Sequence, residues 1–402
     1  MGLPAPRMKK RLLLGLALVM LTVTGGCKPG PWTLWNSYAA RFVDGQGRVI
    51  DPRGGGKTTS EGEAYAMFFA LADNDRSAFD RLLGWTQNNL ASGDLQTHLP
   101  SWSWGQSSTG EWKALDSNSA SDADVWMAYT LVEAGRLWNQ PRYSNLGRRM
   151  MAQIAKSEVV DLPGFGPMLL PGPVGFQHDR VPVVKSANDR FWTLNPSYLP
   201  VFVFQRLAGE DPSGPWGQIA LGIPRLLRES AVHGYAMDWV DYVPGDGFYP
   251  APAHPGPTPA GQEPEVATGS YDAIRVYLWA GMMERGKFRS EVLDAVPAMG
   301  AYLVDHDAPP EKISDRGIPM AQDGPVGFSA AVLPYLRALP NQGKPGAKQT
   351  IRLSAQRDQA SGLYGKDVAY YDQNLALFAT GFLDGRFRFG ANGELKVEWT
   401  RT

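Results

Sequence analysis

The sequence predicts an all-α fold in a single domain. Apolar residues recur at intervals of three and four in about a dozen segments, which is the spacing of one helix face. Alternating strand patterns are few, and no change of composition along the 402 residues marks a second domain. So many helices bury their apolar faces only in two layers, stacked as pairs or wound into a closed double ring. The pattern alone leaves both arrangements open.

The helical segments differ in how regular their apolar spacing is. Regular spacing predicts six helices, at residues 67–72, 79–90, 125–138, 198–207, 219–227 and 274–283. Weaker spacing predicts six more, at residues 35–42, 146–154, 292–304, 328–339, 351–356 and 373–382. Long connections rich in Gly, Pro and Trp lie between them, notably residues 162–175 and 242–265. The second is rich in Pro, so we expect it to be an extended surface loop.

Composition narrows the class of protein. The 39 Lys and Arg residues balance 40 Asp and Glu residues, whereas a nucleic-acid binder needs a basic face. An apolar content of 43% is too high for a disordered chain, and a chain of this length buries a core without a metal or a disulfide. Aromatic residues make up 11% of the chain, so we expect some of their rings to line a binding surface.

Residues 1–26 are predicted to be an export signal. Four basic residues at its start precede an apolar run from 12 to 23, which is too short to span a membrane comfortably. We therefore expect the mature chain, residues 27–402, to be periplasmic or secreted. Cys27 stands where bacterial lipoproteins are acylated. A lipid on Cys27, which would be the one membrane contact, and plain cleavage beside it both remain open.

Acidic residues open three of the predicted helices, next to Ser or Thr. The segments are 58–63, 119–124 and 268–272. Each acid on its own fits a structural role, because a carboxylate in the first turn stabilises a helix by ~0.3–1 kcal/mol. The spacing also suits capping boxes, in which the pairs would be Thr58 with Glu61, Ser60 with Glu63, and Ser121 with Asp124. Position alone therefore makes none of these acids catalytic.

The neighbours of these acids favour a second interpretation. Trp102 and Trp104 precede the second segment, and Tyr271 lies within the third. If the helices alternate in direction, the three helix starts meet at one end of the array. Carboxylates beside aromatic rings suit glycoside hydrolysis, in which one acid protonates the leaving oxygen and a base activates water. A helix start lowers the pKa of a general acid at Glu61, so burial or a neighbouring carboxylate, such as Asp122, must raise it.

Other chemistries fit the sequence poorly. Residues 54–58 look like a phosphate-binding loop, but Asp51 stands where that motif needs its first Gly. The five His residues show no ligand spacing, so we predict neither a metal nor another cofactor. Cys27 lies at the edge of the mature chain, and no Gly-x-Ser-x-Gly elbow occurs, so neither signal for a Cys or Ser nucleophile is present.

Residues 120–138, ASDADVWMAYTLVEAGRLW, closely resemble the signature of glycoside hydrolase family 8. Four shorter segments are similar to other motifs of that family: SEG at 60–62, NPSY at 195–198, SYDAIR at 270–275 and YYD at 370–372. The likeness runs from about Trp32 to Gly390. Within the family, the chain is most similar to the periplasmic endoglucanases encoded with bacterial cellulose synthase, on the strength of WTQNNL at 85–90 and GPVGFSAA at 324–331.

The resemblance implies an (α/α)6 barrel, a toroid of six helical hairpins, and an endo-β-1,4-glucanase that hydrolyses cellulose with inversion. By the same resemblance, Glu61 would be the general acid, Asp272 the general base, and Asp122 would hold the distorted sugar. Arg275 lies one helical turn after Asp272 and would orient its carboxylate. The other expected sugar contacts are Tyr198, Tyr371, Trp102, Trp104 and Asp124.

The expected function implies a substrate and a partner, and two alternative functions remain open. We expect a β-1,4-glucan chain as substrate and the cellulose synthase or export complex as a partner. A family 8 hydrolase for chitosan, xylan or mixed-linkage glucan is one alternative. The other is a glycan-binding export component without catalysis, which the loss of a carboxylate would favour, although Glu61, Asp122 and Asp272 are all present.

Overall fold

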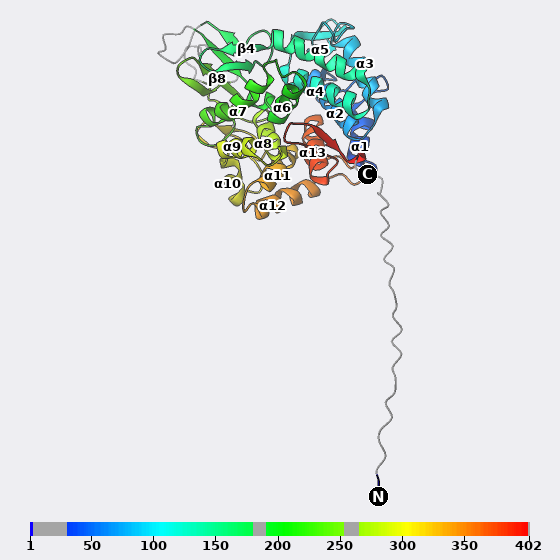
Figure 1. The fold of residues 1–402 in the computed structure, drawn as a ribbon, viewed down its shortest axis with the longest axis vertical. Coiled ribbons are helices and arrows are strands. Elements are labelled where there is room, and N and C mark those ends of the chain that lie inside the picture. The colour runs from blue at the N-terminus through cyan, green and yellow to red at the C-terminus, as the bar shows by residue number, and fades with distance from the viewer. Residues whose placement is uncertain (3–29, 180–189, 253–264, 401–402) are drawn as a thin grey trace.

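The computed structural model describes residues 1–2, 30–179, 190–252 and 265–400, in which it has thirteen α-helices (Figure 1). Six of them form an inner ring: α2 (Ser60–Ala72), α4 (Ser121–Leu137), α6 (Val201–Glu210), α8 (Ala273–Met282), α11 (Val326–Ala338) and α13 (Tyr370–Asp384). Contacts run from α2 through α4 to α6, and from α8 through α11 and α13 back to α2. Phe202 of α6 lies edge-on to Trp279 of α8, which closes the ring.

A second layer of helices covers the ring from outside. Its members are α1 (Thr33–Phe42), α3 (Arg76–Asn89), α5 (Pro141–Ser157), α7 (Trp216–Ser230), α9 (Lys287–Ala295), α10 (Ala298–Asp305) and α12 (Gly343–Ala355). All but α10, which contacts α12, pack on a ring helix. Ring helices such as α4 are buried on nearly every side, whereas α5 buries one face. The closed double ring confirms the (α/α)6 barrel.

Aromatic side chains fill the centre of the inner ring. The Trp126 ring centroid lies 5.1 Å from those of Phe68 and Phe378 and 5.2 Å from that of Trp279. These rings come from α2, α4, α8 and α13, and all four are buried. The middle of the barrel is therefore a packed core, and a ligand can bind only at its ends or on its outside.

Short antiparallel strands occupy the connections between the helices. Three form a sheet next to the start of α2: β1 (Thr58–Thr59), β2 (Ser101–Gln106) and β3 (Trp112–Ser119). A four-stranded sheet contains β6 (Gln177–His178), β7 (Phe191–Leu194), β8 (Trp239–Val243) and β9 (Gly247–Ala251). The remaining pairs are β4 (Val159–Leu162) with β5 (Gly166–Leu169), β10 (Thr268–Gly269) with β11 (Ile313–Ser314), and β12 (Phe387–Phe389) with β13 (Leu395–Val397).

The strands correct the expectation of loops at 162–175 and 242–265. The hairpins β4–β5 and β8–β9 occupy part of these regions, and glycines with positive φ, Gly164 at 79° and Gly245 at 87°, allow their tight turns. The helix expected over 292–304 is also wrong as one element, since Pro297 separates α9 from α10. The other expected helices are confirmed, with ends that differ by several residues in places. The segment expected from 198 begins in a 3₁₀ turn, and its α-helix, α6, starts only at Val201.

Some expectations lie outside the described residues. These are the export signal, Cys27 and the middle of the proline-rich segment, residues 253–264. Among the helices that the structure does describe, none combines the length and the apolar character needed to cross a bilayer.

Candidate active site

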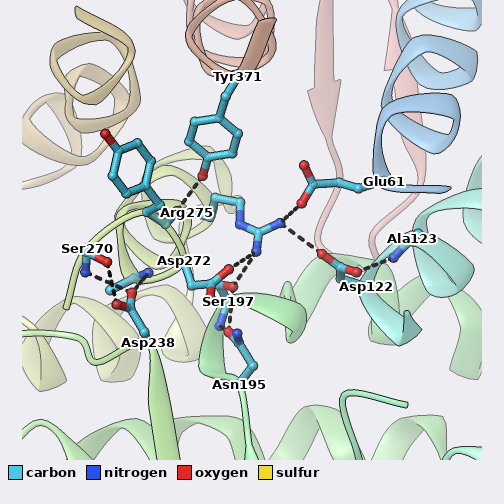
Figure 2. Close-up of polar contacts among 12 residues, drawn as sticks. Glu61, Asp122, Ala123, Asn195, Ser197, Asp238, Ser270, Asp272, Arg275 and Tyr371 are labelled. Atoms are coloured by element: carbon cyan, nitrogen blue, oxygen red, sulfur yellow. Dashed lines mark hydrogen bonds and ion pairs between the residues drawn. The ribbon is translucent and has the colours of Figure 1, made fainter. Parts of the chain in front are cut away.

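Three ring helices begin at one small cleft, which brings their first-turn carboxylates together (Figure 2). Glu61 comes from α2, Asp122 from α4, and Asp272 immediately precedes α8. All three line a cavity of about 150 Å³, whose remaining lining residues are Thr59, Ser60, Trp102, Ala120, Tyr198 and Arg275. The expectation that three helix starts meet at one end of the array is therefore confirmed.

The guanidinium group of Arg275 joins the three carboxylates. Its Nη1 donates to Glu61 and to Asp122 Oδ2, the second at 2.9 Å, and its Nη2 donates to Asp272 Oδ1 at 2.6 Å. The arginine side chain is only 2% exposed. One buried cation thus offsets much of the repulsion among three acids that would otherwise disfavour each other's charge.

Neighbouring side chains fix the position of that guanidinium group. Nη1 also donates to the Tyr65 hydroxyl and Nη2 to Ser197 Oγ, each at 3.0 Å. Ser197 is itself held, because Asn195 Oδ1 accepts from its backbone N–H at 3.0 Å and from its hydroxyl at 2.7 Å. Because its donors are engaged on several sides, Arg275 keeps one orientation, and it sets the directions of the carboxylates around it.

The cleft raises the pKa of two of its acids, Glu61 and Asp122. Burial raises the pKa of Glu61 to about 8; the positive charge of Arg275 opposes this, and the negative charges of Asp122 and Asp272 add to it. Burial also raises the pKa of Asp122, against Arg275 and the Ala123 N–H. The helix start alone would have lowered the pKa of Glu61, so burial outweighs the helix dipole here. Glu61 therefore keeps its proton at neutral pH.

The capping boxes suggested by the sequence are not formed. The cap of α2 is Thr59, whose Oγ1 accepts from the Gly62 N–H at 3.2 Å. Thr58 instead donates to the Val49 carbonyl, and Glu63 accepts from the Val49 N–H at 2.7 Å. Ser121 is already inside α4 and donates to a loop carbonyl. Because Thr59 caps α2, the Glu61 carboxylate takes no part in the cap and faces the cleft.

The expected sugar-binding residues fall into two groups. Trp102, which is 41% exposed, and Tyr198 line the cleft, and the Tyr198 ring lies 5.5 Å from the Arg275 guanidinium carbon. Tyr371 donates its hydroxyl to the Tyr271 carbonyl beside Arg275 (Figure 2). Asp124 belongs to the second group, because its side chain is fully buried and its carboxyl pairs with Glu158 behind the cleft. Asp124 therefore does not face the cleft.

Trp104 is also outside the cleft lining. Its ring stacks on Trp112 with a centroid distance of 5.0 Å and meets Trp85 edge-on at 5.3 Å. The guanidinium carbon of Arg48 lies 4.5 Å from the Trp104 ring centroid. This cluster supports the sheet that carries Trp102, so Trp104 packs within the sheet, and its expected contact with a sugar stays a prediction.

Two residues that hold the site carry no recognisable signal in the sequence. In the sequence, Tyr65 is indistinguishable from the other apolar positions of α2. Asp238 precedes β8, and no motif surrounds it. Ser197 appeared only within the NPSY segment, although an Asn two residues before a Ser is a recognisable turn signal. Within the described part of the chain, no three His, Cys, Asp or Glu side chains are grouped so that they could hold a metal ion.

An acid with a raised pKa, further carboxylates and two aromatic rings in one cleft of an α-helical barrel are typical of a glycoside hydrolase. The chain belongs to a particular family of these enzymes, because the model of the glycosyl hydrolases family 8 matches residues 5–385. An endoglucanase of Xanthomonas axonopodis pv. citri is 42% identical over 92% of this chain and 90% of its own. The endoglucanase of Escherichia coli K12 is 40% identical over 96% of this chain and 95% of its own.

Solved structures agree with this assignment. The crystal structure of an endo-1,4-D-glucanase from Vibrio fischeri ES114 superposes with a TM-score of 0.79 and 35% identity. That match covers 92% of this chain and the whole of the Vibrio chain. The family resemblance stated from the motifs is thereby confirmed.

Proposed function

We propose that this enzyme is an endo-β-1,4-glucanase that cleaves its substrate with inversion. The observation that carries the proposal is the convergence of Glu61, Asp122 and Asp272 around Arg275 in the cleft. Relatives named endoglucanase, with about 40% identity along nearly the whole chain, support the substrate class.

The chemistry assigns a different role to each carboxyl group. Glu61, protonated at neutral pH, gives its proton to the glycosidic oxygen as the bond to the anomeric carbon breaks. Asp272 takes a proton from a water molecule, whose oxygen bonds to that carbon from the opposite face. Asp122 accepts hydrogen bonds from hydroxyls of the distorted sugar. Trp102 and Tyr198 offer rings for the apolar faces of the sugars.

The proposal is tested by the Glu61→Gln variant, which keeps the shape of the side chain but has no acidic proton. We expect its release of reducing ends from carboxymethylcellulose to fall by about 10²–10⁴-fold, with an unchanged circular dichroism spectrum. Glu111→Gln, at an exposed site, is the matched control and should retain wild-type activity. Near-normal turnover by Glu61→Gln would remove Glu61 from the role of general acid.

A substrate panel decides between the alternatives. Wild-type enzyme is incubated with carboxymethylcellulose, mixed-linkage glucan, xylan and chitosan, and reducing ends and viscosity are followed. The proposal expects a rapid loss of viscosity on carboxymethylcellulose. Faster hydrolysis of another polymer favours that β-glycan as the substrate. Binding to cellulose without any hydrolysis favours the non-catalytic glycan-binding component.

We also propose that the chain is exported and acts on cellulose during its synthesis. The support is the basic and apolar N-terminal pattern and the resemblance to the synthase-associated endoglucanases. Cell fractionation of the full chain beside Cys27→Ser tests this proposal. The expected location is the periplasm or the medium, and a shift from membrane to soluble fraction in the variant identifies a lipid on Cys27. Recovery in the cytoplasm would contradict export.

A further inference from the structure

The first turn of α8 has an unusual cap. Asp272 is the N-cap residue, a position at which an Asp side chain normally accepts from the backbone N–H groups of its own helix. Here the Asp272 carboxylate makes no such bond. It accepts instead from Arg275 Nη2 at 2.6 Å and lines the cleft.

Asp238 supplies the missing cap from another part of the chain. Its Oδ1 accepts from the backbone N–H groups of Ala273 and Ser270, each at 2.8 Å, and its Oδ2 accepts from the Ser270 hydroxyl at 2.6 Å (Figure 2). The next two N–H groups, of Ile274 and Arg275, donate to backbone carbonyls at 3.1 and 3.0 Å. No N–H group of this turn therefore needs the Asp272 carboxylate.

The surroundings of Asp238 hold its side chain in one position. Its side chain is 7% exposed, and its backbone N–H donates to the Thr268 carbonyl at 2.8 Å. Gly269 lies so close that an added Cβ would be 2.2 Å from the Ala236 carbonyl oxygen. The strand start that carries Asp238 and the loop that carries Asp272 are thus locked together, with no room for a larger residue between them.

We propose that Asp238 is a positioning residue for Asp272: it caps α8 in place of the Asp272 carboxylate and so leaves that carboxylate to face the cleft. The inference rests on the proposed function of Asp272 as the general base. Without the carboxylate of Asp238, the vacant N–H of Ala273 draws the Asp272 side chain back onto its own helix, away from Arg275 and the reacting water. A displacement of this kind, of about 1 Å, costs on the order of 10²-fold in rate.

The test compares Asp238→Asn with Asp238→Glu. Asn keeps the length and the acceptor oxygen for the two N–H groups, and its amide N–H₂ donates to the Ser270 oxygen. Glu keeps the charge but moves the oxygens by one methylene. If Asp238 acts by position, Asn keeps kcat within about threefold of wild type, whereas Glu and Ala lower kcat by about 10–100-fold with KM nearly unchanged. A kcat for Glu at or above that for Asn overturns the proposal.

Two controls separate capping from general stability and from the proposed function. Asp75 caps α3 by accepting from the Ala78 N–H at 2.9 Å, so Asp75→Ala should lower the melting temperature without lowering kcat. Asp272→Asn is assayed in parallel. An active Asp272→Asn rejects the base assignment, whereas an inactive Asp272→Asn beside a fully active Asp238→Ala rejects only the positioning role. If Asp238→Ala fails to fold, the comparison of Asn with Glu still decides.

Discussion

Arg275 Nη1 donates to Asp122 Oδ2 at 2.9 Å, which joins the first turns of α8 and α4 across 153 residues of sequence. The same nitrogen donates to Glu61, and the other terminal nitrogen donates to Asp272. A single flat cation with several fixed donors thus links three elements of the inner ring at the cleft. The positions of the three carboxylates therefore depend on the charge and the shape of the Arg275 side chain.

Arg275→Lys is expected to lower kcat/KM by at least about 10²-fold, because one ammonium group cannot bond to three carboxylates in fixed directions. The loss is measured with soluble carboxymethylcellulose, and folding is checked by thermal unfolding. Arg225→Lys is the matched control, since Arg225 makes a half-exposed helix pair with Glu229. Equal activity of the two variants contradicts a central role for Arg275.

The activity is expected to fall at alkaline pH as the carboxyl cluster loses the proton of its acid. Because burial raises the pKa of Glu61 to about 8, the proposed general acid is protonated below that pH and ionised above it. The free-enzyme profile of kcat/KM should therefore decline with an apparent pKa near 8. Asp122→Asn removes a negative charge that raises this pKa, so its residual activity should decline at lower pH than that of the wild type. If the alkaline decline of kcat/KM occurs at the same pH in Asp122→Asn as in the wild type, the charge of Asp122 does not raise the pKa of Glu61.

The buried carboxyl groups of Asp124 and Glu158 are expected to make the stability of the fold depend on pH. Ser119 Oγ donates to Glu158 Oε1 at 2.5 Å, and none of the ion pairs found among the described residues includes either acid. Burial raises the pKa of both carboxyl groups, that of Glu158 to about 7. The folded state therefore holds a proton that the unfolded chain has already released, so stability falls as the pH rises from about 4.5 to about 7.

The double variant Asp124→Asn with Glu158→Gln removes this titration. From the shift of Glu158 alone, the wild type should lose up to about 3 kcal/mol of unfolding free energy across that interval, and the variant should lose less. Urea unfolding at several pH values measures how steeply the unfolding free energy falls with pH in the wild type and in the variant. Parallel slopes mean that the pair holds no extra proton in the folded enzyme.

Trp102 and Trp104 share one strand and are expected to respond differently to truncation. Trp102 faces the cleft, so Trp102→Ala should raise KM by about five- to tenfold, the loss of roughly 1 kcal/mol of ring contact. Trp104 packs against Trp85 and Trp112, so Trp104→Ala should lower the melting temperature by several degrees. Each variant is the control for the other, and a reversed pattern contradicts the different roles of the two rings.

Local sequence signals account for the helices and for part of the site. Helix formation and first-turn acids are read from neighbouring residues, so the segments that carry Glu61, Asp122 and Asp272 are predictable. The contact between Arg275 and Asp272 is also local, because the two are three residues apart at the start of α8. The contacts of Arg275 with Glu61 and Asp122 span 214 and 153 residues, and only the closed ring of helices brings them about.

Other features depend on packing that no local spacing reveals. The strands of β4–β5 and β8–β9 are four or five residues long and lie among turn-forming Gly and Pro, so they read as loops. Asp124 has the spacing of a capping residue, yet the approach of α5 buries it against Glu158. Asp238 caps α8 from 35 residues away. Contacts of this kind depend on which segments of the chain pack together in the fold.

The anomeric form of the first product shows whether Glu61 and Asp272 act with inversion. Proton NMR follows a soluble cello-oligosaccharide during hydrolysis, before the new reducing end mutarotates. Because water attacks opposite the departing β-linked chain, we expect the α-anomer to accumulate first and Asp272→Asn to form almost no product. First appearance of the β-anomer would contradict inversion, and normal product formation by Asp272→Asn would contradict the role of Asp272 as the general base.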